Sequence, residues 1–273
     1  VVGGSNMKKS DALTGIGLLL GIGMMIYGMM LGSSLMIFWD LSSVLITVGG
    51  SLSAVLITVP LDQMKKIGKV FIQAFKESSY SEQNVITQFS ELSKKARREG
   101  LLSLEDEIST LEDDFLKKGL QMVVDGIEPE TIREILELEI GEMENRHSQG
   151  ASIFSTWGAY APGFGMLGTL IGLIQMLQNL SDATTIAQGM GKALITTFYG
   201  SLLANIFCNP IAANLQKKSE KEVNIREMML EGVLAIQSGV NPRIVEEKLI
   251  SYLEPAERLE YLKNNAENSE GVA

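Results

Sequence analysis

The chain has 273 residues, of which 45% are hydrophobic and 6% aromatic, and its formal net charge at pH 7 is −10. This charge, without a basic patch interleaved with aromatic residues, argues against nucleic-acid binding, because phosphate recognition needs clustered positive charge. One cysteine, Cys208, excludes an internal disulfide framework, and one histidine, His147, leaves no Cys/His cluster with metal-ligand spacing. We therefore expect no metal, no cofactor and no catalytic residues.

Charged residues fall in blocks that alternate with apolar segments. They are almost absent from residues 14–60 and 149–191, whereas residues 61–146 and those after 216 are rich in them. This distribution is typical of membrane spans joined by soluble segments. It predicts an all-α integral membrane protein with four transmembrane helices and a helical cytoplasmic domain between the second and third spans. Residues 1–6, before Met7, are interpreted as an expression-vector remnant.

Residues 7–60 are predicted to contain the first two spans. Residues 13–31 are long enough to cross a hydrocarbon core of roughly 30 Å, and residues 41–59 form the second span. The link between them contains no Lys or Arg, whereas lysines flank the pair on both outer sides, at Lys8, Lys9, Lys65, Lys66 and Lys69. The positive-inside rule therefore places the link on the extracytoplasmic side and both flanks in the cytoplasm.

The soluble block, residues 61–150, contains no long alternating pattern and is predicted to be helical. Gly100 follows several cations and marks a helix C-terminus, where positive charge is favourable. Ser103 and Asp106 have the spacing of a capping box, and Pro129 suits the first turn of the next helix. That helix is expected to continue into the third span, with acidic residues on its outer face: Glu134, Glu137, Glu142 and Glu144.

Residues 151–213 are predicted to hold the third and fourth spans, at 153–177 and 186–213, joined by a polar link that contains Asp182. Positive charge returns after the fourth span, so both chain termini are predicted to be cytoplasmic. The C-terminal segment, residues 214–273, is predicted to continue as a helix to about Gly232. A short helix capped by Asn241, with Pro242 at its first position, and a disordered tail from residue 264 should follow.

Gly163, Gly165 and Gly168 spell G-x-G-x-x-G, the pattern of a dinucleotide-binding loop. That loop needs a preceding strand and a βαβ unit, but here the glycines lie inside an apolar run. Close helix packing or a kink explains them better. Gly191 and Lys192 lack the upstream glycine and following hydroxyl of a phosphate-binding loop, so nucleotide hydrolysis finds no support.

Pro162 and Pro210 lie in or beside the third and fourth spans, where a proline acts either as a tolerated kink or as a functional hinge. The notable polar side chains in these spans are threonines, whose simplest role is a hydrogen bond to the preceding helical turn: Thr169, Thr196 and Thr197. Apart from Lys192, the spans contain no buried carboxylate, arginine or histidine. If the protein conducts ions, a partner must therefore supply the carboxylate.

Opposite charges flank the turn at Gly100. Arg97 and Arg98 precede it, and Glu105, Asp106 and Glu107 follow it. A solvated charged surface is the default interpretation of such a cluster.

The sequence resembles the MotA/PomA family of flagellar stator proteins over residues 7–262. Three motifs in the family's order of spans carry the resemblance: ARREGLLSLE at 96–105, APGFGMLGTLIG at 161–172, and TTFYG at 196–200 leading to NPIA at 209–212. The resemblance implies a subunit that converts ion-motive force across the bacterial inner membrane into torque for motility and chemotaxis.

The resemblance also implies partners and roles for particular residues. A homopentamer would surround a dimer of the single-span protein MotB, whose aspartate binds the permeating ion. Arg97 and Glu105, helped by Arg98 and Asp106, would contact the rotor protein FliG, making residues 61–150 the torque-transmitting domain. Pro162, Thr169, Thr196, Thr197 and Pro210 would belong to the ion pathway and its coupling to rotation.

The permeating ion is H⁺ or Na⁺, and the threonines at 169 and 197 resemble those of sodium-driven members. Two alternatives remain for the function. An ExbB/TolQ-type energiser belongs to the same superfamily, but it has three spans instead of four. The other alternative is a membrane scaffold without ion flux.

Overall fold

The computed structural model describes residues 12–76, 81–178 and 183–270. Nearly all of these residues are helical, which confirms the predicted fold class. The chain divides into two compact units, the first comprising Val1–Glu77 and Arg146–Lys218 and the second Ser78–Asn145 and Ser219–Ala273. Lys8, Lys9, Asp182 and residues 1–6, which were predicted to be a vector remnant, lie outside the described residues.

Among the described residues, four helices are long and apolar enough to cross a membrane, and their apolar stretches lie in the first unit. Its elements, in chain order, are α1 (Ala12–Gly32), η1 (Leu35–Phe38), α2 (Leu41–Val44), η2 (Leu45–Gly49), α3 (Gly50–Thr58), α4 (Leu61–Met64), α5 (Ile67–Ala74), α9 (Pro129–Leu177), α10 (Ala183–Leu202), η4 (Leu203–Cys208) and α11 (Asn209–Gln237). The turns η2 and η4 are π-helical and widen the second and fourth spans. Both α9 and α11 contribute residues to the two units.

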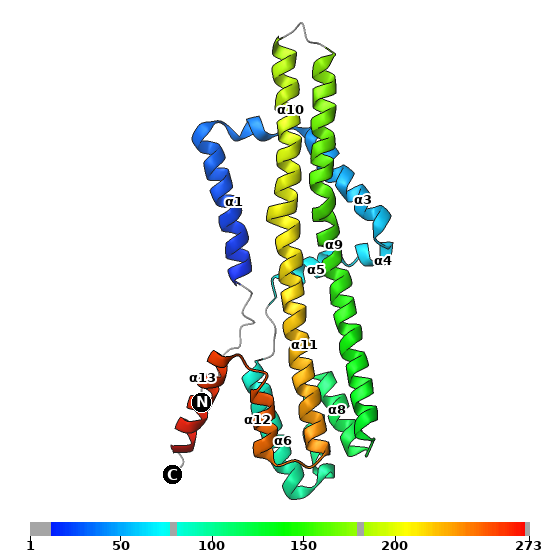
Figure 1. The fold of residues 1–273 in the computed structure, drawn as a ribbon, viewed down its shortest axis with the longest axis vertical. Coiled ribbons are helices and arrows are strands. Elements are labelled where there is room, and N and C mark those ends of the chain that lie inside the picture. The colour runs from blue at the N-terminus through cyan, green and yellow to red at the C-terminus, as the bar shows by residue number, and fades with distance from the viewer. Residues whose placement is uncertain (1–11, 77–80, 179–182, 271–273) are drawn as a thin grey trace. The chain divides into compact units, whose positions relative to one another are not determined.

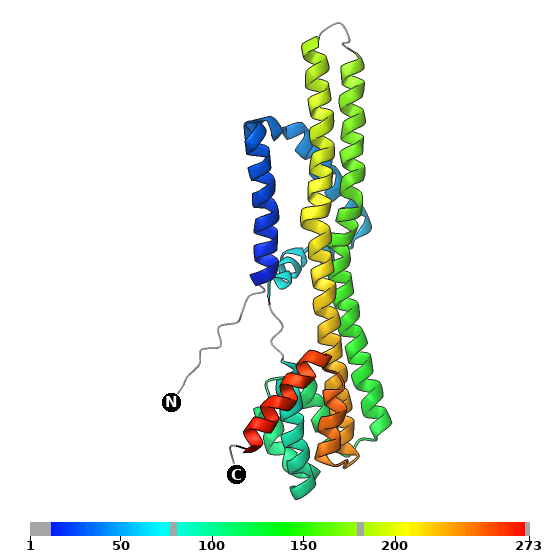
Figure 2. The ribbon, with the colours of Figure 1, turned by 60° about the vertical axis from the view of Figure 1, so that its left-hand side comes forward.

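Small residues allow α9 and α10 to run side by side, as both ribbon views show (Figures 1 and 2). A Cβ added at Gly165 would lie 2.9 Å from the Thr196 carbonyl oxygen, and one at Gly168 would lie 2.5 Å from the Thr196 side chain. Gly200 makes the same allowance on α10, since a Cβ there would lie 2.7 Å from a backbone oxygen of α9. Two glycines of the G-x-G-x-x-G pattern thus serve close helix packing.

The second unit is a helical domain with its own hydrophobic core. It combines the start of α9 and the end of α11 with α6 (Glu82–Glu99), η3 (Leu101–Ser103), α7 (Leu104–Thr110), α8 (Asp114–Val124), α12 (Pro242–Ile250) and α13 (Pro255–Glu270). Amphipathic helices bury one apolar stripe each, and the centre of the core is formed by Phe89, Leu104, Leu120, Leu136, Val233 and Leu249, all fully buried. Gly232 leaves room for the Phe89 ring, which would lie 2.6 Å from an added Cβ.

Most of the predicted helix boundaries are confirmed. Helix α6 ends at Glu99 because Gly100 has φ +89°, a conformation that disfavours other residues. Pro129 begins α9, which continues without a break to Leu177. The Asn241 side chain accepts a hydrogen bond of 3.1 Å from the Arg243 N–H and so caps α12.

Three local predictions are wrong. Ser103 does not cap α7, because its own backbone is helical and its hydroxyl donates to the Gly100 carbonyl at 2.7 Å instead. The predicted disordered tail is helical through Glu270 in α13, and residues 271–273 lie outside the described part. The helix after the fourth span also runs past Gly232, to Gln237.

Candidate functional site

The three threonines singled out in the sequence lie together where α9 packs on α10. The Thr169 hydroxyl oxygen lies 3.1 Å from the Gly165 carbonyl and 2.9 Å from the Ala193 carbonyl, and it forms a short hydrogen bond with the Thr197 hydroxyl. Thr196 is buried, and its hydroxyl donates to the same Ala193 carbonyl at 2.9 Å. The bonds to the preceding turn that threonines favour in apolar helices are therefore present, and they join into one threonine cluster.

A second row of hydroxyl groups, on the second span, was not predicted. Ser43, Thr47 and Ser51 are fully buried and spaced four residues apart, which places them on one helix face. The Thr47 hydroxyl donates to the Thr196 carbonyl at 3.3 Å, and the Ser51 hydroxyl accepts a 3.0 Å hydrogen bond from the Trp157 indole. These bonds tie the second span to the helices that carry the threonine cluster. The four-residue spacing within an apolar run was the available signal.

A stripe of exposed polar side chains continues along the fourth span from the threonine cluster. Its members, again spaced by four residues, are Thr197, Ser201, Asn205 and Asn209. The Asn205 amide donates to the Ser201 hydroxyl at 3.3 Å. Lipid tails cannot satisfy hydroxyl and amide groups, so this polar stripe needs protein or water against it.

The two prolines are exposed, and neither interrupts its helix. A proline cannot donate the hydrogen bond of an α-helix to the residue four positions earlier. Pro210 is the second residue after the π-helical turn η4, where the helix is already widened, and such turns are frequent at functional sites. Pro162 lies one turn after Gly158, whose missing side chain admits the Asn209 amide, because a Cβ there would lie 2.2 Å from Asn209 Oδ1. The prolines thus lie beside the polar stripe.

The apolar stretches of the spans, residues 14–32, 41–58, 153–177 and 186–213, contain no carboxylate, and Lys192 is their one charged side chain. Within the described residues, no group of three or more His, Cys, Asp or Glu side chains could hold a metal ion. The site can therefore offer hydroxyl, amide and carbonyl oxygens to a passing cation, but no negative charge of its own.

The charged cluster lies around the turn between α6 and α7 in the second unit. Arg97 and Arg98 are in the last turn of α6, and Glu105 and Asp106 are in the first turn of α7, so each pair is favoured by the adjacent helix dipole. All four side chains are exposed, and none forms an ion pair within 4 Å among the described residues. They are therefore free to meet a partner.

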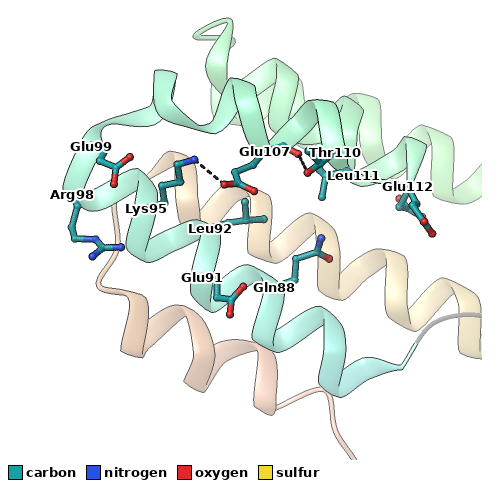
Figure 3. A pocket seen from close by; sticks show the side chains of 11 residues that line it. Gln88, Glu91, Leu92, Lys95, Arg98, Glu99, Glu107, Thr110, Leu111 and Glu112 are labelled. Carbon is teal, nitrogen blue, oxygen red and sulfur yellow. Dashed lines mark hydrogen bonds and ion pairs between the residues drawn. The ribbon is translucent and has the colours of Figure 1, made fainter. Parts of the chain in front are cut away.

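The two helices are braced by an ion pair beside this cluster. Lys95 and Glu107 approach to 2.8 Å, and this hydrogen bond raises the pKa of Lys95. The pair lines a cavity of about 700 Å³ between α6, α7 and the start of α8. Figure 3 shows Arg98 and Glu99 at one end of this cavity and Glu112 at the other. The pair joins the two helices beside the charged residues that they present.

Two further features of this surface were not predicted. Leu102, at the tip of the turn, is 72% exposed in the middle of the charged cluster. A smaller cavity, of about 270 Å³, is lined by Lys94, Arg97, Arg98 and Pro242, so three cations share it without a carboxylate. An apolar tip beside unpaired cations is a suitable contact for a partner that is acidic and partly apolar.

Comparisons with known protein families agree along the chain. Residues 15–100 match the family described as "Motility protein A N-terminal", and residues 107–228 match the "MotA/TolQ/ExbB proton channel family". The matches cover both pairs of spans and the whole of α6, while residues 101–106 of the charged turn lie between the two matches.

Individual relatives give the same result. The chain is 47% identical to motility protein A of Borreliella burgdorferi over 195 residues, which are 71% of this chain and 75% of that protein. It is 37% identical to the chemotaxis protein PomA of Vibrio alginolyticus over 190 residues, 70% of this chain and 74% of the relative. Among solved structures, it is similar to the flagellar MotAB stator complex from Bacillus subtilis, with a TM-score of 0.87, 39% identity, and coverage of 92% of this chain and 99% of that chain.

Proposed function

The chain belongs to the MotA/TolQ/ExbB proton channel family and is a stator subunit of the motility protein A type, and from this premise we propose how its residues act. The single observation that carries the proposal is the polar surface of the third and fourth spans, which carries no carboxylate. A MotB-type partner, as in the solved stator complexes, would place an aspartate beside the threonine cluster. That carboxylate supplies the ion-binding charge that the described spans lack.

Rotation follows from neutralising that carboxylate. In a low-dielectric site, binding of a cation removes a large electrostatic interaction with the surrounding dipoles. The change in charge shifts the preferred position of a dimeric partner inside a homopentamer of this chain, and repeated binding and release drives stepwise rotation. Pro162 and Pro210 border the polar stripe along which the partner would move.

Sodium is the proposed coupling ion. With the Thr169 hydroxyl proton directed to a helix carbonyl, one lone pair of its oxygen accepts from the Thr197 hydroxyl and the second remains available to a cation. A hydroxyl oxygen replaces part of the hydration shell that Na⁺ loses inside the membrane. No cofactor is needed for this chemistry.

Torque is proposed to leave the protein through the turn between α6 and α7. Arg97, Arg98, Glu105 and Asp106 would meet complementary charges on FliG, and Leu102 would add an apolar contact. Exposed charges steer association and set register, while a desolvated leucine at the centre stabilises the contact.

The protein resides in the inner membrane, with both termini proposed to face the cytoplasm. The lysines beside the second and fourth spans support this orientation, since cytoplasmic flanks carry the excess of positive charge.

Motility of a strain that lacks its stator genes tests the whole proposal. This chain, expressed with its MotB-type partner, should restore swimming that stops when the ion gradient is dissipated. An assembled complex that never restores swimming, or swimming unaffected by the gradient, would support the non-conducting scaffold instead.

A further inference from the structure

A band of basic side chains surrounds one end of the spans in the first unit. Residues 61–76, 146–149 and 214–218 contain seven Lys or Arg residues and one acidic residue, Asp62. We name this band the basic collar: Lys65, Lys66, Lys69, Lys76, Arg146, Lys217 and Lys218. The collar is positively charged, whereas the chain as a whole has a net charge of −10.

Hydrogen bonds hold the three segments of the collar at one level. The Asn214 amide donates to the Thr14 hydroxyl at 2.7 Å, at the start of the first span. The side chains of Gln63 and Gln149 are joined at 3.1 Å. The Lys218 ammonium donates to two carbonyls at the C-terminal end of α5, at 2.5 and 2.8 Å. Lys218 is thus engaged within the protein, whereas the other six cations are exposed, and Lys65 lies 3.6 Å from Asp62 in a surface ion pair.

The helix α5 crosses the long helices instead of running along them (Figure 1). Its inner face packs tightly. The Phe71 ring stacks on Phe207 with centroids 5.5 Å apart, and a Cβ added at Gly150 would lie 3.3 Å from the Val70 side chain. Its outer face carries the exposed Lys69, with the exposed Lys66 at its N-cap, together with Ile72, which is 56% exposed. Cations and an apolar side chain on one exposed helix face are typical of a helix in the headgroup region.

We propose that the basic collar is a binding site for anionic phospholipid headgroups, with Lys65, Lys66 and Lys69 as its principal contacts. The positive-inside rule accounts for lysines that follow a span, but not for a crosswise helix whose inner face is locked to the spans while its outer face stays cationic. Charge complementarity selects a phosphate-bearing lipid without a compensating ammonium group. This site depends on the membrane spans, but not on which ion flows or on the rotor contact.

The assembled complex of this chain with its MotB-type partner, purified in detergent, allows a direct test. Binding is measured by native mass spectrometry during titration with phosphatidylglycerol, phosphatidylcholine or inorganic phosphate. Phosphatidylglycerol should bind more tightly than phosphatidylcholine, and inorganic phosphate should not compete. Each lysine near an anionic headgroup strengthens binding about fivefold, so Lys66→Gln/Lys69→Gln should reduce the preference for phosphatidylglycerol roughly 25-fold.

Matched variants distinguish a site from general charge. Lys117→Gln/Lys263→Gln removes the same charge from exposed positions of the second unit and should keep the preference, as should the charge-conserving Lys66→Arg/Lys69→Arg. Raising salt should weaken phosphatidylglycerol binding to the unaltered complex, because exposed charges are screened. Equal binding of both lipids, competition by inorganic phosphate, salt-independent binding or an equal loss in the control would each overturn the proposal. None of these outcomes bears on stator function, which the motility test decides separately.

Discussion

Thr169 has one proton to donate and two helix carbonyls within reach, so its oxygen can serve both the fold and the ion. Thr169→Ala removes the lone pairs, and the uncompensated desolvation of Na⁺ should raise the sodium concentration for half-maximal swimming speed about tenfold. Thr169→Ser keeps the oxygen, so its sodium concentration for half-maximal swimming speed should stay close to that of the unaltered protein. Swimming speed is measured against external sodium at fixed pH, with membrane levels of the complex determined in parallel.

The choice of ion is decided by the same experiment. Speed that ignores sodium but collapses when the proton gradient is dissipated would show that protons drive the motor. The stator function would then stand, because the family and the fold do not depend on the ion.

At the turn between α6 and α7, charge reversal should uncouple the motor without unfolding it. Arg97→Glu and Glu105→Lys change exposed side chains that form no ion pair among the described residues, so complex levels should stay normal while swimming speed falls by about half or more. Arg258→Glu, another exposed reversal in the second unit, is the matched control. Normal swimming by both variants and by their combination would show that this electrostatic contact is not needed.

At the scale of structural elements, the close packing of α9 against α10 depends on glycines. Gly168→Ala would place a Cβ 2.5 Å from the Thr196 side chain and should destabilise the complex by about 1–3 kcal/mol. Gly141 also lies in α9 but meets no atom within 4 Å, so Gly141→Ala should be neutral or slightly stabilising. Thermal unfolding of the detergent-solubilised complex compares the two, and equal midpoints would refute the packing role.

Glu231 on α11 joins α9 and α12 through Arg133 at 3.1 Å and Lys248 at 2.8 Å. The hydrogen bond from Lys248 holds the pKa of Glu231 below its usual 4.5. Burial opposes this shift, and the hydrogen bond from Arg133 adds to it. Because the folded pKa is depressed, this stabilisation is present above the unfolded pKa and is lost as pH falls through the folded value. Glu231→Gln should therefore lower stability by about 1 kcal/mol at neutral pH and less at acidic pH.

Thermal unfolding between pH 7 and pH 4 measures this difference. If the difference in unfolding temperature between Glu231→Gln and the unaltered protein widens toward pH 4, the assigned ion pairs are contradicted.

Elements were predictable from sequence where a local residue decides the backbone. Gly100 needs a positive φ, Pro129 suits a first helical turn and Asn241 caps its own helix, so each boundary follows from chemistry within a few residues. The prediction that Ser103 caps α7 was wrong because a hydroxyl has several possible partners, and that of Ser103 bonds the Gly100 carbonyl. The spacing of a capping box does not decide that competition.

The missed site residues depend on contacts between distant segments. Thr47 and Ser51 are identified as site residues only by their hydrogen bonds to α10 and Trp157, which lie more than a hundred residues away in the chain. The π-helical turns η2 and η4 likewise arise within apolar runs that carry no local signal for an extra residue per turn. Leu102 looks like a core residue in sequence, and only the structure shows that it projects outward.

At the scale of the whole molecule, the described spans bury little surface within one chain. The first span has none of its residues buried, and the polar stripe on the fourth span faces outward. Lipid can cover the leucines and methionines of these helices, but it cannot pair with the amides of Asn205 and Asn209. The outward polar groups therefore favour assembly with other copies or with a partner more than the apolar area does.

The final prediction is that this chain is not a monomer in mild detergent. The outward polar groups need protein against them, so mass measurement of the purified complex should give several copies per particle. For the proposed ring of five, the copies of this chain alone amount to about 149 kDa, five times 29.8 kDa, with two partner chains in addition. A monodisperse single copy with bound partner would refute the ring. A multimer of another size would retain assembly through the polar stripe and correct the stoichiometry.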